Sequence, residues 1–168
     1  SGHVNKPGVI ELPMGTPLME IIDKHCGGVW KGRKLKGCIP GGSSVPVLTA
    51  EECARVNMDF DSLGAAGTMM GTAAMIVMDE TTSMPNVARR LTRFYDDESC
   101  GQCTPCREGS GWLYQLMQRI EAGDAKTKDL DLALEVATSM GSMPGTTICG
   151  LADGNNWAIR TIMNKYWS

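Results

Sequence analysis

Short apolar runs separated by glycine and proline fill the first 80 residues, and they predict a small α+β unit. Apolar residues at helical spacing predict one helix from Leu18 to Cys26, which the glycines at 27 and 28 end. Thr49 and Glu52 have the spacing of a capping box and predict a short helical turn. Three further runs have the length of strands, namely Val9–Leu12, Lys34–Ile39 and Ala73–Met78. Short strands around a helix are typical of an α+β domain.

From Ser83 onward the apolar positions recur with the period of an α-helix. The pattern predicts four helices, whose apolar stripes cover Val87–Tyr95, Trp112–Ile120, Leu130–Met140 and Trp157–Tyr166. The second helix is predicted to begin at or near Pro105. The glycine and proline residues in 141–145 predict the end of the third helix. Four helices with short connections predict a bundle. We therefore expect two domains, residues 1–80 and residues 81–168.

Composition narrows the class of protein. The 168 residues are 42% hydrophobic, which is enough for one good core or two small ones. A net charge of −3 with mixed signs argues against a nucleic-acid partner. The longest apolar-leaning run, Ala65–Met78, is shorter than the ~20 residues of a membrane span, so we expect no membrane insertion. Nothing resembling a secretion signal opens the sequence, so its seven cysteines are expected to be reduced thiols or metal ligands.

Four of the cysteines form a pattern that predicts a metal site. Cys100, Cys103 and Cys106 stand within seven residues, and Cys149 follows after two predicted helices. Three thiolates at this spacing can bind one face of a cubane iron-sulfur cluster while the distant one completes the fourth corner. Zinc bound by four cysteines is the main alternative, although zinc sites usually use two separated CxxC pairs. Chance buried thiols or disulfides are the third interpretation. The other cysteines, at 26, 38 and 53, are expected to be small core residues.

Groups that could stabilise such a cluster are present around it in the sequence. A cluster with four thiolates is negatively charged, so its burial requires compensating dipoles or cations. If a helix starts at Pro105, the N–H groups of residues 106–109 are expected to point at the cluster, and Arg107 is the nearest cation. Gly101 and Gly109 are expected to let the backbone approach the inorganic sulfides. No catalytic constellation is visible, so no catalytic residue is assigned.

Several segments together resemble one known family. They are Ile39-Pro-Gly-Gly-Ser-Ser-Val-Pro, Met58-Asp-Phe-Asp-Ser-Leu-Gly, Glu98-Ser-Cys-Gly-Gln-Cys-Thr-Pro-Cys-Arg-Glu-Gly and Thr147-Ile-Cys-Gly-Leu-Ala-Asp-Gly. The chain resembles the C-terminal half of the NADH-binding flavoprotein subunit of respiratory complex I (NADH:quinone oxidoreductase), and the diaphorase subunits of NAD-linked hydrogenases and formate dehydrogenases. The resemblance implies a β-grasp (ubiquitin-like, SLBB-type) domain followed by a four-helix domain with a 4Fe-4S cluster. Carried over by position, the cluster ligands are Cys100, Cys103, Cys106 and Cys149.

The resemblance also implies a function. Members of the family pass a hydride from NADH to FMN, and then pass single electrons through this cluster to further clusters and quinone. Nothing here corresponds to their FMN/NADH domain, so the chain is expected to be a fragment that relays electrons but is not an active enzyme alone. The implied partners are the other subunits of the complex, including a thioredoxin-like 2Fe-2S subunit and the large Fe-S subunit. The implied location is cytoplasmic, peripheral to the inner membrane, or the matrix side in a eukaryote. A metal-stapled interaction module without redox turnover is the alternative, and hydrogenase or formate chemistry remains open.

Overall fold

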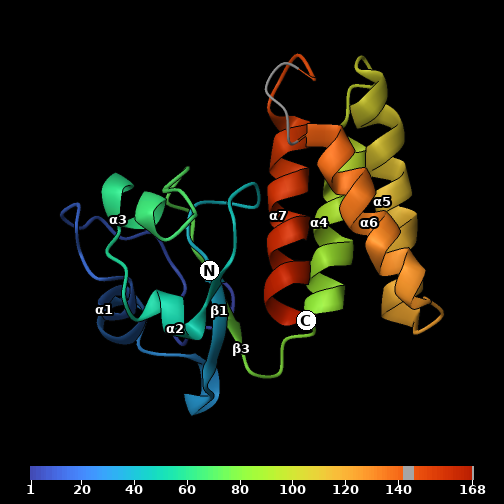
Figure 1. The fold of residues 1–168 in the computed structure, drawn as a ribbon. Coiled ribbons are helices and arrows are strands. Elements are labelled where there is room, and N and C mark those ends of the chain that lie inside the picture. Colours follow the sequence, from blue (N-terminus) through green and yellow to red (C-terminus); the bar gives the residue numbers. More distant parts are fainter. Residues whose placement is uncertain (142–145, 168) are drawn as a thin grey trace. The chain divides into compact units, whose positions relative to one another are not determined.

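Two units make up the chain in the computed structural model, which describes residues 1–141 and 146–167 (Figure 1). The first unit is Ser1–Thr82 and the second is Ser83–Ser168. The sequence prediction placed the division after residue 80, where the apolar period changes. The first unit combines a small sheet with short helices, and the second is built from helices alone. The expected α+β fold class is confirmed.

A three-stranded antiparallel sheet organises the first unit. Its central strand is β1 (Leu35–Ile39), with β2 (Leu48–Thr49) on one edge and β3 (Ile76–Asp79) on the other. Cys38 lies opposite Leu48 on one side and Val77 on the other. A bulge between Leu35 and Gly37 interrupts the pairing with β3. Each edge of β1 is therefore already paired.

Two strand predictions need correction. The strand predicted from Ala73 begins only at Ile76, because Ala73 has a φ of +55° and this left-handed backbone cannot continue a strand. The strand predicted at Val9–Leu12 is wrong, since residues 7–13, all of which the structure describes, form no regular element. Val9 is fully exposed to solvent. Its apolar residues give the segment the composition of a strand, but Val9 and Ile10 are exposed, so no packing against a sheet stabilises a strand there.

Short helices complete the first unit. The predicted helix forms as α1 (Leu18–Glu20), which continues directly into the π-helical turn η1 (Ile21–His25). A 3₁₀ turn, η2 (Trp30–Gly32), precedes β1. The predicted capping box is confirmed at the start of α2 (Ala50–Cys53), where the Thr49 N–H donates to Glu52 at 2.8 Å. A further helix, α3 (Phe60–Ala65), was not predicted; the Asp59 carboxylate caps it by accepting from the Ser62 N–H at 2.7 Å.

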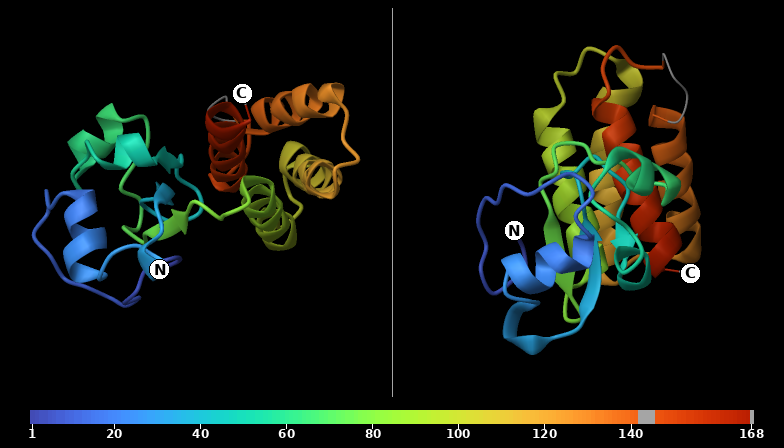
Figure 2. Two further views of the ribbon diagram at one scale, coloured as in Figure 1. Left: turned by 90° about the horizontal axis from the view of Figure 1, so that it is seen from below. Right: turned by 90° about the vertical axis from the view of Figure 1, so that its left-hand side faces the viewer.

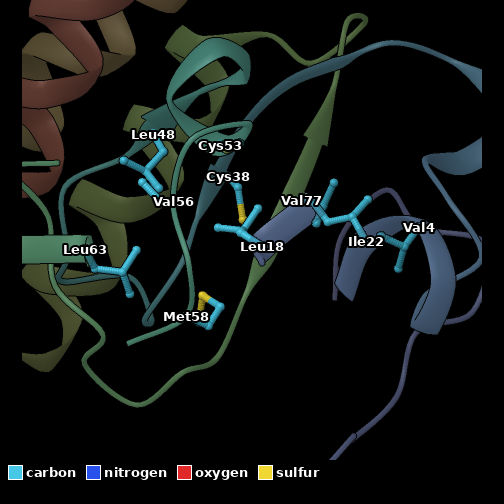
Figure 3. Close-up of a cluster of buried hydrophobic side chains, with 10 residues drawn as sticks. All are labelled: Val4, Leu18, Ile22, Cys38, Leu48, Cys53, Val56, Met58, Leu63 and Val77. Carbon is cyan, nitrogen blue, oxygen red and sulfur yellow. The ribbon is translucent and has the colours of Figure 1, made fainter. Parts of the chain in front are cut away.

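The core of the first unit lies between these helices and the sheet (Figure 3). It contains ten buried side chains: Val4, Leu18, Ile22, Cys38, Leu48, Cys53, Val56, Met58, Leu63 and Val77. Cys38 and Cys53 are thus core residues, as expected. Cys26 is half-buried and packs against these core side chains. The neighbouring Cys53 thiol, together with burial, raises the pKa of Cys38 well above its ordinary value. Cys38 is therefore held as a neutral thiol.

A buried carboxylate closes the end of β3. Asp79 is inaccessible to solvent; its Oδ2 accepts from Arg33 Nη1 at 3.0 Å, and its Oδ1 accepts from the Thr81 hydroxyl at 2.7 Å. The Asp79 N–H also donates to His3 Nδ1 at 3.3 Å, which ties the first residues of the chain to the strand. Burial alone would raise the pKa of Asp79, but the hydrogen bonds from Thr81 and Arg33 outweigh it and hold the pKa below its ordinary value.

This carboxylate makes the stability of the first unit depend on pH. Because the folded-state pKa lies below the unfolded one, the contribution is complete above about pH 4 and is lost as the pH falls further. Asp79→Asn is expected to lower the free energy of unfolding by about 2–3 kcal/mol at pH 7, and by less at pH 3. Hydrogen exchange of residues 76–82 as a function of pH measures the effect. Asp61→Asn, at an exposed position in the first turn of α3, is the control and should lower the free energy of unfolding by less than about 1 kcal/mol, because it loses only the interaction with the helix start.

Four long helices form the second unit. They are α4 (Met84–Glu98), α5 (Thr104–Ala122), α6 (Thr127–Gly141) and α7 (Leu151–Tyr166). Each helix packs on the next, and α7 packs on α4, so the four close into a bundle (Figure 2, left). The expected four-helix arrangement is confirmed. Among the helices that the structure describes, none is long and apolar enough to cross a membrane.

Details of the bundle differ from the sequence prediction. Of the predicted α4 stripe, Tyr95 is buried, but Phe94 is 48% exposed, and the other buried positions are Met84, Ala88 and Thr92. On α5, Trp112 is 56% exposed although it was assigned to the apolar stripe. Helix α7 begins at Leu151, six residues before the predicted stripe. Helix α6 ends at Gly141, and the rest of its predicted stop, residues 142–145, lies outside the described residues.

Candidate metal centre

The turn between α4 and α5 carries three of the four candidate ligands. Helix α4 ends at Glu98, and Gly101 turns the chain with a φ of +74°. Cys103 is the N-cap of α5, and Pro105 lies in the first helical turn, as predicted. Cys100 therefore lies in the turn, Cys103 at the helix start and Cys106 within the first turn of the helix.

The fourth candidate, Cys149, reaches the same place from a different helix. Gly150 is the N-cap of α7, so Cys149 immediately precedes that helix. The four cysteines line one cavity of about 110 Å³. Its full lining is Glu98, Ser99, Cys100, Gln102, Cys103, Cys106, Thr147, Cys149 and Leu151. Its lining is predominantly apolar. All four cysteines that the sequence singled out are thus placed around one cavity.

The four thiols differ in burial and in hydrogen bonding. Cys106 is 8% exposed and Cys103 is half-buried, whereas Cys100 and Cys149 are exposed. The Ile148 N–H donates to Cys103 Sγ at 3.3 Å. The Ser99 hydroxyl lies 3.4 Å from Cys106 Sγ. The two inner thiols therefore have polar neighbours supplied by the segments that precede Cys149 and Cys100.

The start of α5 provides a positive dipole at the cavity. The N–H groups of Thr104 and Cys106 belong to the first turn, where helix geometry provides no intrahelical acceptor, and Pro105 has no N–H. The Arg107 N–H already donates to the Cys103 carbonyl oxygen at 2.9 Å. The prediction that the N–H groups of residues 106–109 point at the cluster is therefore corrected, because the available donors are those of Thr104 and Cys106. The free amides at this helix start favour negative charge on the neighbouring sulfurs.

The structure gives two of the three predicted supporting residues another contact. Arg107 Nη1 donates to the Gly101 carbonyl oxygen at 3.0 Å, and its Nε donates to Glu108 at 3.0 Å, so the guanidinium braces the turn and is already paired. A Cβ atom at Gly109 would lie 2.9 Å from Met140 Sδ, so the absence of a side chain there allows α5 and α6 to approach closely. Gly101 keeps its predicted position in the turn beside the cysteines.

Sequence reasoning missed several residues that line the cavity. They are Glu98, Ser99, Gln102, Thr147 and Leu151, to none of which the sequence assigns a role. Each is next to or near a cysteine of the motif, so adjacency was the available signal. Adjacency alone cannot distinguish a side chain that faces the cysteines from one that faces solvent.

The residues present fit an iron-sulfur cluster. Four sulfur donors suit a soft metal centre that needs four protein ligands. Within residues 1–141 and 146–167, no three cysteine, histidine or acidic side chains gather closely enough to hold a single metal ion. The cavity of about 110 Å³ exceeds the ~10–15 Å³ that one water needs, so it has room for a group of several atoms.

Comparisons with known proteins match both halves of the chain. The NADH-ubiquinone oxidoreductase-F iron-sulfur binding region matches residues 86–168, and the SLBB domain matches residues 1–77. The F subunit of NADH-quinone oxidoreductase from Rickettsia bellii is 51% identical over 167 residues, which are 99% of this chain and 39% of that protein. The mitochondrial NADH dehydrogenase (ubiquinone) flavoprotein 1 of Dictyostelium discoideum is 49% identical over 99% of this chain and 34% of its own length.

A solved structure has the same fold. The NAD+-reducing NiFe-hydrogenase in its H2-reduced state superimposes with a TM-score of 0.84 and 24% identity, covering 100% of this chain and 27% of that chain. The chain thus spans less than half the length of each of these relatives. The expected cofactor, a 4Fe-4S cluster, is the one for which the family of residues 86–168 is named. The chain therefore belongs, through an SLBB domain followed by the NADH-ubiquinone oxidoreductase-F iron-sulfur binding region, to the family of the C-terminal region of the NADH-quinone oxidoreductase F subunit.

Proposed function

We propose that this chain is an electron relay whose 4Fe-4S cluster is held by Cys100, Cys103, Cys106 and Cys149. The single observation that carries the proposal is the cavity of the helical unit, which all four thiols line. When bound, the cluster supplies a centre that accepts and releases one electron at a time. The chain's own residues hold it, compensate its charge and limit the access of water.

The four cysteines and the start of α5 have different roles in this proposal. Cys103 and Cys106, on one helix start, fix the cluster to α5, while Cys149 connects it to α7. The first-turn amides of α5 stabilise the negative charge of the thiolates. Cys106, at 8% exposure, lies on the inner side, and the exposed Cys100 and Cys149 lie on the solvent side. Electrons are expected to enter or leave most readily at the exposed side.

The family supports a place for this relay in a larger assembly. We propose that it serves NADH oxidation coupled to quinone reduction, because relatives 46–51% identical are named as F subunits of NADH-quinone oxidoreductase. In that setting a hydride passes from NADH to FMN on a part of the protein that precedes this region. The proposed partners are other subunits of the complex, including a 2Fe-2S subunit and a large Fe-S subunit. The proposed location is the cytoplasmic or matrix face of the membrane.

A redox titration of the anaerobically reconstituted chain tests the proposal. Dithionite is expected to bleach the visible absorption and to produce a low-temperature electron paramagnetic resonance signal that integrates to about one spin per cluster. The chain loaded with zinc is the control and should show neither change, because zinc has no accessible redox state. Reconstituted chain that dithionite fails to reduce would be a structural module instead of a relay.

A further inference from the structure

The Ser99 hydroxyl lies between the turn and the most buried candidate ligand. Its Oγ accepts a hydrogen bond from the Gly101 N–H at 3.3 Å and lies 3.4 Å from Cys106 Sγ. Ser99 is the C-cap of α4, and its N–H donates to the Asp96 carbonyl oxygen, so the backbone that carries the hydroxyl is fixed. The Ser99 hydroxyl is therefore held in place by the fixed backbone of Ser99 and by the Gly101 N–H.

The direction of the hydrogen bond to Cys106 follows from the chemistry of the two groups. A cysteine that binds a metal is a thiolate and has no proton to donate. The Gly101 N–H already uses one lone pair of Ser99 Oγ, which leaves the hydroxyl proton for another acceptor. In the loaded protein, Ser99 is thus the donor and Cys106 Sγ is the acceptor.

Such a bond acts on the redox equilibrium. Reduction adds one negative charge that the cluster shares with its thiolates, so a donor to a thiolate stabilises the reduced state more than the oxidised state. Because Cys106 is buried, water has little access to replace a lost donor there. Cys103 receives its hydrogen bond from the Ile148 backbone N–H, which no side-chain substitution removes. Ser99 is therefore a side chain through which the sequence can adjust the reduction potential.

We propose that Ser99 is a positioning residue that raises the reduction potential of the cluster by donating a hydrogen bond to Cys106. The inference rests on the proposed function, because it requires the cluster to be bound by these cysteines. Ser99→Ala removes the donor, Ser99→Thr retains a hydroxyl, and Ser139→Ala is the matched control. Ser139 is an exposed serine of α6 that does not line the cavity.

The experiment measures iron and sulfide content first and the midpoint potential second, by dye-mediated titration of the reconstituted chain. Ser99→Ala is expected to retain the cluster and to shift the midpoint potential to a more negative value. Ser99→Thr should restore most of the unmodified value, and Ser139→Ala should leave the potential unchanged. An Ala variant with full iron content and an unchanged potential overturns the role of Ser99. Absence of iron from the unmodified chain overturns the proposed function instead.

A measurement on the unmodified chain covers the case in which Ser99→Ala fails to retain the cluster. Brief transfer to D₂O replaces the rapidly exchanging hydroxyl proton by a deuteron before the hydrogen-bonded Ile148 N–H exchanges, and this is expected to shift the iron-thiolate stretching bands in the resonance Raman spectrum. Ser99→Thr is expected to retain that shift. Bands that stay at the same frequency in D₂O contradict a hydrogen bond to the thiolate and overturn the proposal.

Discussion

Cys103→Ala is expected to abolish the intact four-iron cluster and to destabilise the helical unit. Cys103 is the N-cap of α5, and its sulfur accepts from the Ile148 N–H, so it connects two helix starts as well as binding metal. Ligand binding contributes to folding stability wherever the site is absent from the unfolded chain. We expect the iron content to fall below half of that of the unmodified chain, and the denaturant midpoint of the second unit to fall with it.

Cys26→Ala is the matched control for this prediction. Cys26 is also a half-buried cysteine, but it lies at the end of η1 against the core of the first unit. The Cys26 variant should retain full iron content and an unchanged midpoint for the helical unit. If Cys103→Ala retains four iron atoms and the same visible spectrum, the ligand set proposed for this cavity is wrong.

Gly141→Ala is expected to destabilise the helical unit strongly although it removes no sulfur. A Cβ atom at Gly141 would lie 2.5 Å from the Ala152 carbonyl oxygen and 2.7 Å from the Asp153 nitrogen. These are backbone atoms of the first turn of α7, so they cannot move without moving the helix that follows Cys149. We expect a loss of at least about 3 kcal/mol in the free energy of unfolding, beyond the usual cost of overpacking. Urea denaturation followed by far-ultraviolet circular dichroism measures it.

Gly111→Ala separates this effect from the general consequences of removing a glycine. Gly111 lies inside α5, where a Cβ atom would meet only the flexible end of the Asp96 side chain at 3.3 Å. Its replacement should be neutral or stabilising by up to about 1 kcal/mol, because alanine favours a helix over glycine. Equal stability of the two variants would contradict the close backbone approach between α6 and α7.

The sequence predicts the parts of the fold that local chemistry determines. The start of α5 follows from Pro105, the capping box from Thr49 and Glu52, and the four helices from apolar period. The face that each helix buries is less predictable, because it depends on its neighbours. In α4 the buried face is shifted by one residue from the most apolar stripe, and Phe94 is left half exposed. The strand prediction at Val9–Leu12 fails for a related reason, since the exposed Val9 and Ile10 do not pack against a neighbouring sheet.

The candidate site is likewise only partly predictable from the sequence. The spacing of the cysteines identifies four residues that line one cavity, even though Cys149 stands 43 residues after Cys106. Cys149 lies near the other three cysteines because α7 packs in the bundle, and no local sequence pattern specifies that packing. The roles of individual supporting residues depend on side-chain direction. Gly109 therefore proved to be a packing residue against Met140, whereas Ser99, which the sequence did not distinguish, contacts Cys106.

Iron and acid-labile sulfide content of the anaerobically reconstituted chain tests the central claim most directly. The cluster bound by Cys100, Cys103, Cys106 and Cys149 requires about four iron atoms and four sulfide ions per chain. We expect these values, together with no more than trace zinc. A well-folded chain that contains no iron and one zinc ion would contradict it.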